Sequence, residues 1–124
     1  MILDSDLLIS IDRNERAART FLTAAARSET ALHTTHPVLA QVWRSESRQA
    51  RLSAFLETIT IHPLDDGRAV GQLLARSSTS DVVDAHLVIT AARLGHDILT
   101  GDLDDLTTLT SLLGPASPTV HAWP

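Results

Sequence analysis

Apolar residues recur with the spacing of a helix along much of the chain. From residue 6 to residue 27 they follow a period near 3.6, and the polar triplet 12–14 divides this stretch into two helices. His36 and Pro37 open another helix, because proline is tolerated in a first turn. The same spacing predicts helices over residues 48–57, 65–75, 82–94 and 104–113.

Short apolar runs lie between these helices and have the composition of buried strands. The run 58–62 is rich in β-branched residues and stops at Pro63. We expect further strands over residues 1–3, 31–34, 98–100 and 118–122. Alternating strands and helices predict an α/β fold: a three-layer α/β/α sandwich with a mostly parallel central sheet of four to five strands. The 124 residues suit a single domain, 1–124.

Composition narrows the function classes. With 3% aromatic residues, stacking platforms for single-stranded nucleic acid are not expected, and with no cysteine, zinc–thiolate sites are excluded. The net charge is −5 and all ten basic residues are arginine, so bulk charge does not favour nucleic acid. No apolar run is long enough to span a membrane, and the N-terminus lacks a signal pattern. We therefore expect a cytoplasmic protein without a membrane partner.

Aspartates stand where predicted strands turn into helices. Asp4 and Asp102 each follow a strand, and Asp84 lies in the first turn of the most apolar helix, three residues after Asp81. Parallel strands gather ligands at their carboxyl ends, and carboxylates that meet there need a cation. Oxygen ligands without cysteine favour Mg²⁺ or Mn²⁺. The alternative interpretation is helix capping, which suits Asp81 best and Asp102 next.

These residues, in this order, resemble the PIN-domain family and, within it, the VapC-type toxins of bacterial toxin–antitoxin pairs. The resemblance spans nearly the whole chain and rests on four segments, namely 2–5 (Ile-Leu-Asp-Ser), 36–44 (His-Pro-Val-Leu-Ala-Gln-Val-Trp-Arg), 80–85 (Ser-Asp-Val-Val-Asp-Ala) and 99–102 (Leu-Thr-Gly-Asp) with Asp105.

The resemblance implies a Mg²⁺-dependent endoribonuclease, with Mn²⁺ as a substitute ion, that acts as a toxin. It places Asp4, Asp84 and Asp102 around the metal as catalytic residues. It further implies a homodimer, an RNA substrate and a VapB-like antitoxin whose tail covers the acidic cleft. Residues with supporting roles near the acidic cluster would be Ser5, Thr100, Asp81 and Asp105.

One position departs from the family pattern. Where the family usually has a glutamate on the helix after Pro37, this chain has Gln41. The resemblance places Gln41 among the catalytic residues, where it keeps an oxygen ligand but loses a charge. On a continuous helix Glu46 would face elsewhere and would not substitute for it. The alternative hypothesis is therefore a weakened PIN-like protein that acts mainly by binding antitoxin and RNA. Asp6 or Asp81 would then compensate in charge.

Two further patterns have open interpretations. Arg44, Arg48 and Arg51 recur at helical spacing, which fits either a stripe that contacts RNA or antitoxin or a solvated helix face. The D-x-D spacing of Asp4 and Asp6 also occurs in phosphatase-like enzymes with an aspartate nucleophile, but the absence of lysine and the small size disfavour that class.

Overall fold

Five short strands form one parallel sheet at the centre of the structure, a computed structural model that describes residues 1–124. The strand order is β3-β2-β1-β4-β5, and all four pairings are parallel. The outer strands β3 and β5 each have one neighbour. The strands are β1 (Ile2–Leu3), β2 (His33–Thr35), β3 (Thr60–His62), β4 (Ile98–Thr100) and β5 (Val120–Ala122).

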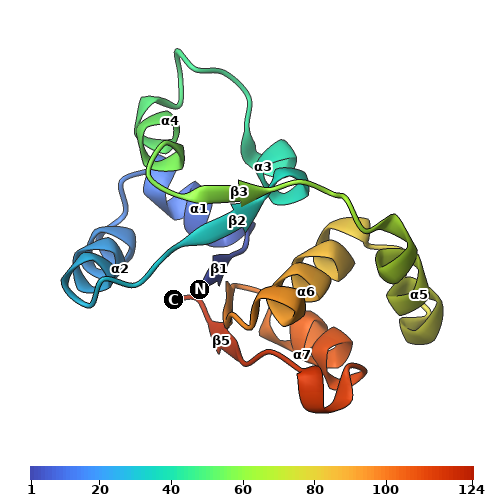
Figure 1. Ribbon diagram of the computed structural model, residues 1–124. Helices are drawn as coiled ribbons and strands as arrows, with labels where there is room; N and C mark the ends of the chain where they lie inside the picture. The colour runs from blue at the N-terminus through green and yellow to red at the C-terminus, as the bar shows by residue number, and fades with distance from the viewer.

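Seven helices connect these strands and cover the sheet. Figure 1 shows α1 and α2 on one side of the sheet, α5, α6 and α7 on the other, and the two chain ends close together. None of the helices is long and apolar enough to cross a membrane. The helices are α1 (Ser5–Asp12), α2 (Arg16–Arg27), α3 (His36–Val42), α4 (Ala50–Leu56), α5 (Gly67–Ser77), α6 (Val82–Leu94) and α7 (Leu103–Ser111), followed by the 3₁₀ turn η1 (Gly114–Ala116).

Neighbouring residues of the central strands face opposite layers, as a strand period of two requires. Ile2 and Ile98, which pair in register, pack into the larger core with side chains of α5, α6 and α7. Leu3 and Leu99, the next registered pair, pack into a smaller core with α1 and α2. The predicted three-layer α/β/α sandwich with a parallel sheet is thereby confirmed.

The bounds of several helices and strands agree closely with those predicted from the sequence. The helix predicted over 82–94 and the strand predicted over 98–100 have those bounds in the structure. The side chain of Asp81 caps α6, and Gly95 ends the helix in the left-handed conformation. The second strand lies at His33–Thr35 rather than 31–34. The helices predicted over 48–57, 65–75 and 104–113 have ends shifted by one or two residues.

The region after α3 differs from the prediction. The helix ends at Val42, and the chain runs through an irregular segment, 43–49, before α4. The side-chain oxygen of Gln49 accepts hydrogen bonds from the backbone N–H groups of Arg44 (2.6 Å) and Ser45 (3.1 Å), and its amide donates to the carbonyl oxygen of Val42 (2.8 Å). These contacts hold the irregular segment in place.

The helical arrangement expected for the arginines of this region was therefore wrong. Arg44 and Arg48 lie in the irregular segment and Arg51 in α4, so the three arginines do not form a stripe on one helix. Glu46 also lies in the irregular segment and not on α3, so the helix angle used to set it aside does not apply. The side chains of Glu46 and of the three arginines are all exposed to solvent.

Candidate active site

The carboxyl group of Asp4 is fixed at the carboxyl end of the central strand β1. It is only 5% exposed. One oxygen, Oδ2, accepts a hydrogen bond from the Thr100 hydroxyl at 2.7 Å, and Oδ1 accepts one from the backbone N–H of Ser5 at 2.7 Å. Asp4 is also the N-cap of α1. Burial raises the pKa of this carboxyl group, while the hydrogen bonds from Thr100 and Ser5 lower it by less.

Thr100 connects the ends of β1 and β4. Its hydroxyl donates to Asp4 and accepts a hydrogen bond from the backbone N–H of Asp102 at 2.9 Å. Because Thr100 is 1% exposed, this hydroxyl has little access to water and both bonds are formed within the protein. The predicted supporting role of Thr100 thus has a physical basis: one buried hydroxyl positions two of the three aspartates.

Asp84 enters the same region from α6. The carboxyl group of Asp81 accepts from the backbone N–H of Asp84 at 3.0 Å and caps the helix, so the side chain of Asp84 remains free of that role. Asp84 is half-buried, whereas the neighbouring His86 is 1% exposed and points into the core. Asp81 is therefore the N-cap of α6, and its carboxyl group lies close enough to Asp84 to raise the pKa of that residue.

Burial and neighbouring carboxyl groups raise the pKa values of all three predicted aspartates. Burial, followed by the charges of Asp81, Asp4 and Asp102, raises the pKa of Asp84 to about 7. Loss of solvent and the adjacent carboxyl group of Asp105 raise the pKa of Asp102, to which Asp4 also contributes. Each shift reflects unfavourable negative charge. Asp4, Asp84 and Asp102, which come from β1, α6 and the β4–α7 turn, thus share one region of negative potential.

Asp6 adds a further carboxylate through a contact with Gly101. A Cβ atom on Gly101 would lie 2.7 Å from Cγ and 3.1 Å from Cβ of Asp6, so the aspartate side chain occupies the space above the glycine. The charge of Asp6 also raises the pKa of Asp4. No sequence pattern predicts the contact between Asp6 and Gly101, because it depends on how α1 lies over the end of β4.

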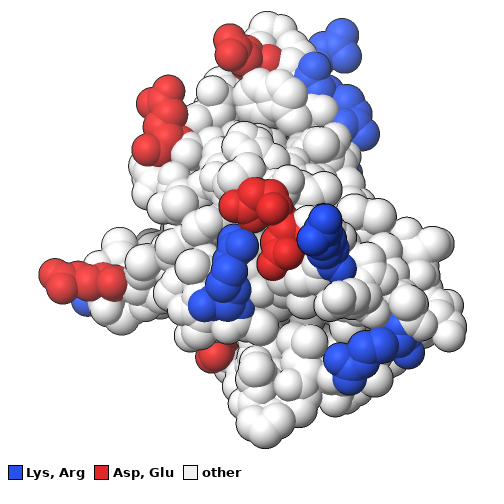
Figure 2. Space-filling model, turned by 45° about the vertical axis from the view of Figure 1, so that its right-hand side comes forward, with Lys and Arg blue, Asp and Glu red and all other residues white.

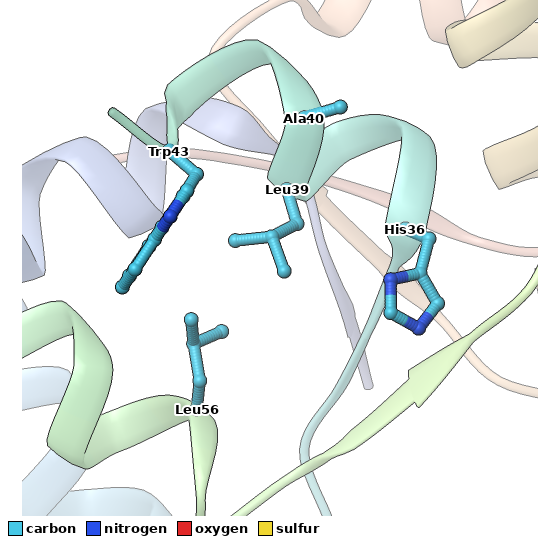
Figure 3. A pocket seen from close by; sticks show the side chains of 5 residues that line it. All are labelled: His36, Leu39, Ala40, Trp43 and Leu56. Carbon is cyan, nitrogen blue, oxygen red and sulfur yellow. The ribbon is translucent and has the colours of Figure 1, made fainter. Parts of the chain in front are cut away.

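An open polar cavity of about 350 Å³ has Asp84 in its wall, whereas Asp4 and Asp102 do not line it. Its lining includes Asp84 from α6 and Asp105 from α7, with hydroxyl groups around them; the other lining residues are Thr79, Ser80, Asp81, Thr108 and Leu109. A cavity of about 270 Å³ between α3 and α4 has a different character (Figure 3). It is lined by four apolar residues and His36 and contains no carboxylate.

The remaining predicted site residues make fewer contacts. Gln41 is exposed in the last turn of α3 and forms no hydrogen bond with any of the aspartates. Ser5 contributes its backbone N–H to Asp4, and its hydroxyl forms no hydrogen bond. Arg44 and Arg48 are exposed, and the guanidinium group of Arg44 donates to the carbonyl oxygen of Trp43.

The carboxylates are of the ligand type that divalent cations prefer, but they are not positioned as a ready coordination site. Hard oxygen ligands of combined negative charge are what Mg²⁺ and Mn²⁺ prefer, and their raised pKa values show charge that a cation would neutralise. No three histidine or acidic side chains are grouped closely enough around one point to hold an ion. The fit is therefore one of donor type and charge, without a preformed coordination shell.

A glycine substitution tests the contact between Asp6 and Gly101. Gly101→Ala is expected to lower the free energy of unfolding by about 1 kcal/mol, because the new methyl group must displace the Asp6 side chain. In an Asp6→Ala background the same substitution should cost nothing, as a double-mutant cycle would measure by urea unfolding. Gly71→Ala, in an open position of α5, is the control and should stabilise. An equal cost of Gly101→Ala in both backgrounds would contradict the contact.

Asp84 should make stability depend on pH. Its folded pKa of about 7 exceeds the ordinary value of 3.8, so the folded state binds more protons in that interval and its free energy of unfolding falls as pH rises. In EDTA, Asp84→Asn should therefore melt at a higher temperature than the wild type near pH 8, and this advantage should vanish near pH 4.

The control variant is Glu57→Gln, which removes the same charge from an exposed position at the end of α4. It should lack the pH-dependent advantage. Equal pH profiles for the wild type and Asp84→Asn would show that this carboxylate is not under the repulsion described.

Comparison with known proteins identifies a fold and no family. No protein-family model matches the sequence, and no curated protein matches it. Among solved structures, a chain of the VapBC2 complex from Rickettsia felis, bound to a DNA fragment from its promoter, has the same fold with a TM-score of 0.71. The match covers 99% of this chain and 98% of that chain at 15% sequence identity. At this identity the likeness is one of fold.

Proposed function

We propose that this protein is a divalent-metal-dependent endoribonuclease that acts as the toxin of a toxin–antitoxin pair. The observation that carries the proposal is the electrostatic coupling of Asp4, Asp84 and Asp102 at the carboxyl edge of the sheet. After burial, the charges of Asp4 and Asp102 contribute to the raised pKa of Asp84, and the charge of Asp4 contributes to that of Asp102. The fold shared with a chain of a VapBC2 complex supports the same assignment.

Asp4, Asp84 and Asp102 are the residues that would hold Mg²⁺. When bound, such an ion lowers the pKa of a water molecule and stabilises a leaving oxygen of a phosphodiester. Thr100 holds Asp4 in one orientation, which limits the rearrangement that the site needs. Asp81 and Asp105 add negative charge beside the ligands and so favour a cation in this region.

A bound divalent cation would also reduce the repulsion between this acidic protein and the phosphates of RNA. The protein carries a net charge of −5, and on the face in Figure 2 arginine and acidic side chains lie side by side without an extended basic patch. An acidic cleft repels phosphate unless a cation lies between them. RNA binding at this site is therefore expected to require the divalent ion. Exposed Arg44 and Arg48 remain candidates for further contacts with RNA or the antitoxin.

An antitoxin partner and a homodimer belong to the same proposal. The fold neighbour is a VapBC2 complex, and apolar cavities flank α4 on both of its sides, one with Leu39 and Trp43 and two that share Leu22 and Phe55. Such surfaces suit an amphipathic segment of a partner protein. A basic side chain of the partner would be attracted to the aspartates of the candidate site.

The activity is tested with purified protein and a mixed RNA substrate. Cleavage should require Mg²⁺ or Mn²⁺, and Asp4→Asn and Asp84→Asn should each reduce the rate by about 100-fold. Asp66→Asn is the control, because it removes a charge from a helix cap of α5 and keeps the capping oxygen. If both site variants cut RNA at the wild-type rate, the assigned residues are not the active site.

A second candidate function rests on Gln41. A PIN-like protein with an uncharged amide at this position would bind antitoxin and RNA but cut slowly, because the amide cannot deprotonate water. Gln41→Glu should then raise both the affinity for Mg²⁺ and the cleavage rate, by about tenfold. Isothermal titration with Mg²⁺ and the RNA assay measure the two effects. If neither changes, Gln41 lies outside the site and does not limit activity.

A further inference from the structure

Three histidines far from the aspartates meet at the edge of the sheet. They are His33 at the start of β2, His62 at the end of β3 and His96 in the turn between α6 and β4. Nδ1 of His33 lies 2.9 Å from Nε2 of His62. The ring of His96 packs on His33 at a centroid distance of 4.5 Å and an interplanar angle of 32°. We call these residues the histidine cluster.

The two bonded rings share a proton. Their planes differ by 18°, yet their centroids are 5.1 Å apart, which is the separation of rings that meet nitrogen to nitrogen, edge to edge, and not face to face. In such a bond one nitrogen carries the hydrogen and the other must be an unprotonated acceptor. Since no three histidine or acidic side chains surround a common point, a bound metal does not explain the cluster.

The surroundings of the cluster disfavour positive charge. The N-terminal ammonium group faces His33, and Arg93 and the buried His86 of α6 face His62. The acidic groups nearby are already paired: Asp65 with Arg93 at 3.2 Å, and Asp97 with His121 of β5 at 2.8 Å. Both carboxylates are thus engaged with other cationic partners, and only Asp65 still favours a protonated His62, as the smallest of the effects on its pKa.

The hydrogen bond between His33 and His62 joins the edge strand β3 to its neighbour β2. His62 belongs to the edge strand β3, whose only partner in the sheet is β2, through three registered residue pairs. The first backbone bond between this strand and the chain before β2, from Thr60 N–H to the Leu32 carbonyl oxygen, is long at 3.4 Å. The imidazole–imidazole bond is therefore a main side-chain link between β3 and the sheet.

We propose that the histidine cluster is an acid-sensitive latch, which holds the edge strand β3 on the sheet while its imidazoles are neutral and releases the strand when they gain protons. This inference does not depend on the proposed nuclease function. Protonation of both bonded rings leaves two N–H donors facing each other with no acceptor. It also places two positive charges beside Arg93 and the N-terminal ammonium group.

The direction of the pH dependence follows from the same geometry. Burial, then the neighbouring His96 and His62, lower the pKa of His33; burial, then Arg93 and His96, lower that of His62, which Asp65 partly opposes. The ordinary value is 6.5, so the unfolded strand binds protons more readily than the folded one. The stabilisation is complete above that value and is lost as pH falls through the lower, folded pKa values.

Amide hydrogen exchange in the wild-type protein measures the latch. After correction for intrinsic exchange rates, protection of the β3 amides relative to those of β1 should fall about tenfold or more between about pH 7.5 and pH 5. His62→Gln supplies an amide that bonds to His33 in either protonation state, so it should abolish most of this pH dependence. His36→Gln, at an exposed position of α3, should behave like the wild type.

The proposal is overturned if β3 protection in the wild type does not change with pH, or if His62→Gln loses as much protection as the wild type. Far-UV circular dichroism checks that each variant is folded. If His62→Gln does not fold, NMR titration of the wild-type imidazoles decides the matter. The β3 amide shifts should then follow the last protonation step of the His33–His62 pair, below pH 6.5, and β3 amide shifts that follow neither ring titration would contradict the latch.

Discussion

The buried carboxyl group of Asp4 is the constraint on which the site depends. It lies at the end of the central strand, 5% exposed, with one oxygen bonded to a hydroxyl 96 residues away in sequence and the other to the first backbone N–H of α1. A buried acid is tolerated only when such partners satisfy it. Because Thr100 also accepts from Asp102, fixing Asp4 fixes the start of the β4–α7 turn.

The negative charges at the carboxyl edge of the sheet destabilise the folded protein when the carboxyl groups are ionised. Burial is the largest cause of the raised pKa values of Asp4, Asp84 and Asp102, and neighbouring carboxyl groups raise each of them further. A protein that needed only helix caps would not gather so many acids where each disfavours the ionised form of the next. A cation bound among these carboxylates would relieve their mutual repulsion, and the relief would contribute to its binding affinity. This is the physical argument for the proposed function.

The sequence predicted those parts of the molecule that local signals determine. Asp81 and Gly95 set the ends of α6, and the position of Asp4 and Asp102 after buried strands brought them to one edge of a parallel sheet. The end of α3 was not predictable in this way, because Gln49 reaches back across the irregular segment to the Val42 carbonyl oxygen.

The contact of Asp6 with Gly101 and the bond between His33 and His62 likewise join residues that no spacing rule connects. They depend on how α1 lies over β4 and on the register of β2 with β3. The positions of single backbone elements were thus readable from sequence, while the partners of individual side chains were not.

Manganese-induced line broadening in the NMR spectrum of the labelled protein tests the central claim most directly. Substoichiometric Mn²⁺ should selectively broaden the backbone amides of Ser5, Asp84 and Asp102, and Mg²⁺ should reverse the effect, because these three amides surround the proposed ion. Broadening centred on another part of the chain, or none at these three amides, would contradict the assignment of a metal site to the converging aspartates.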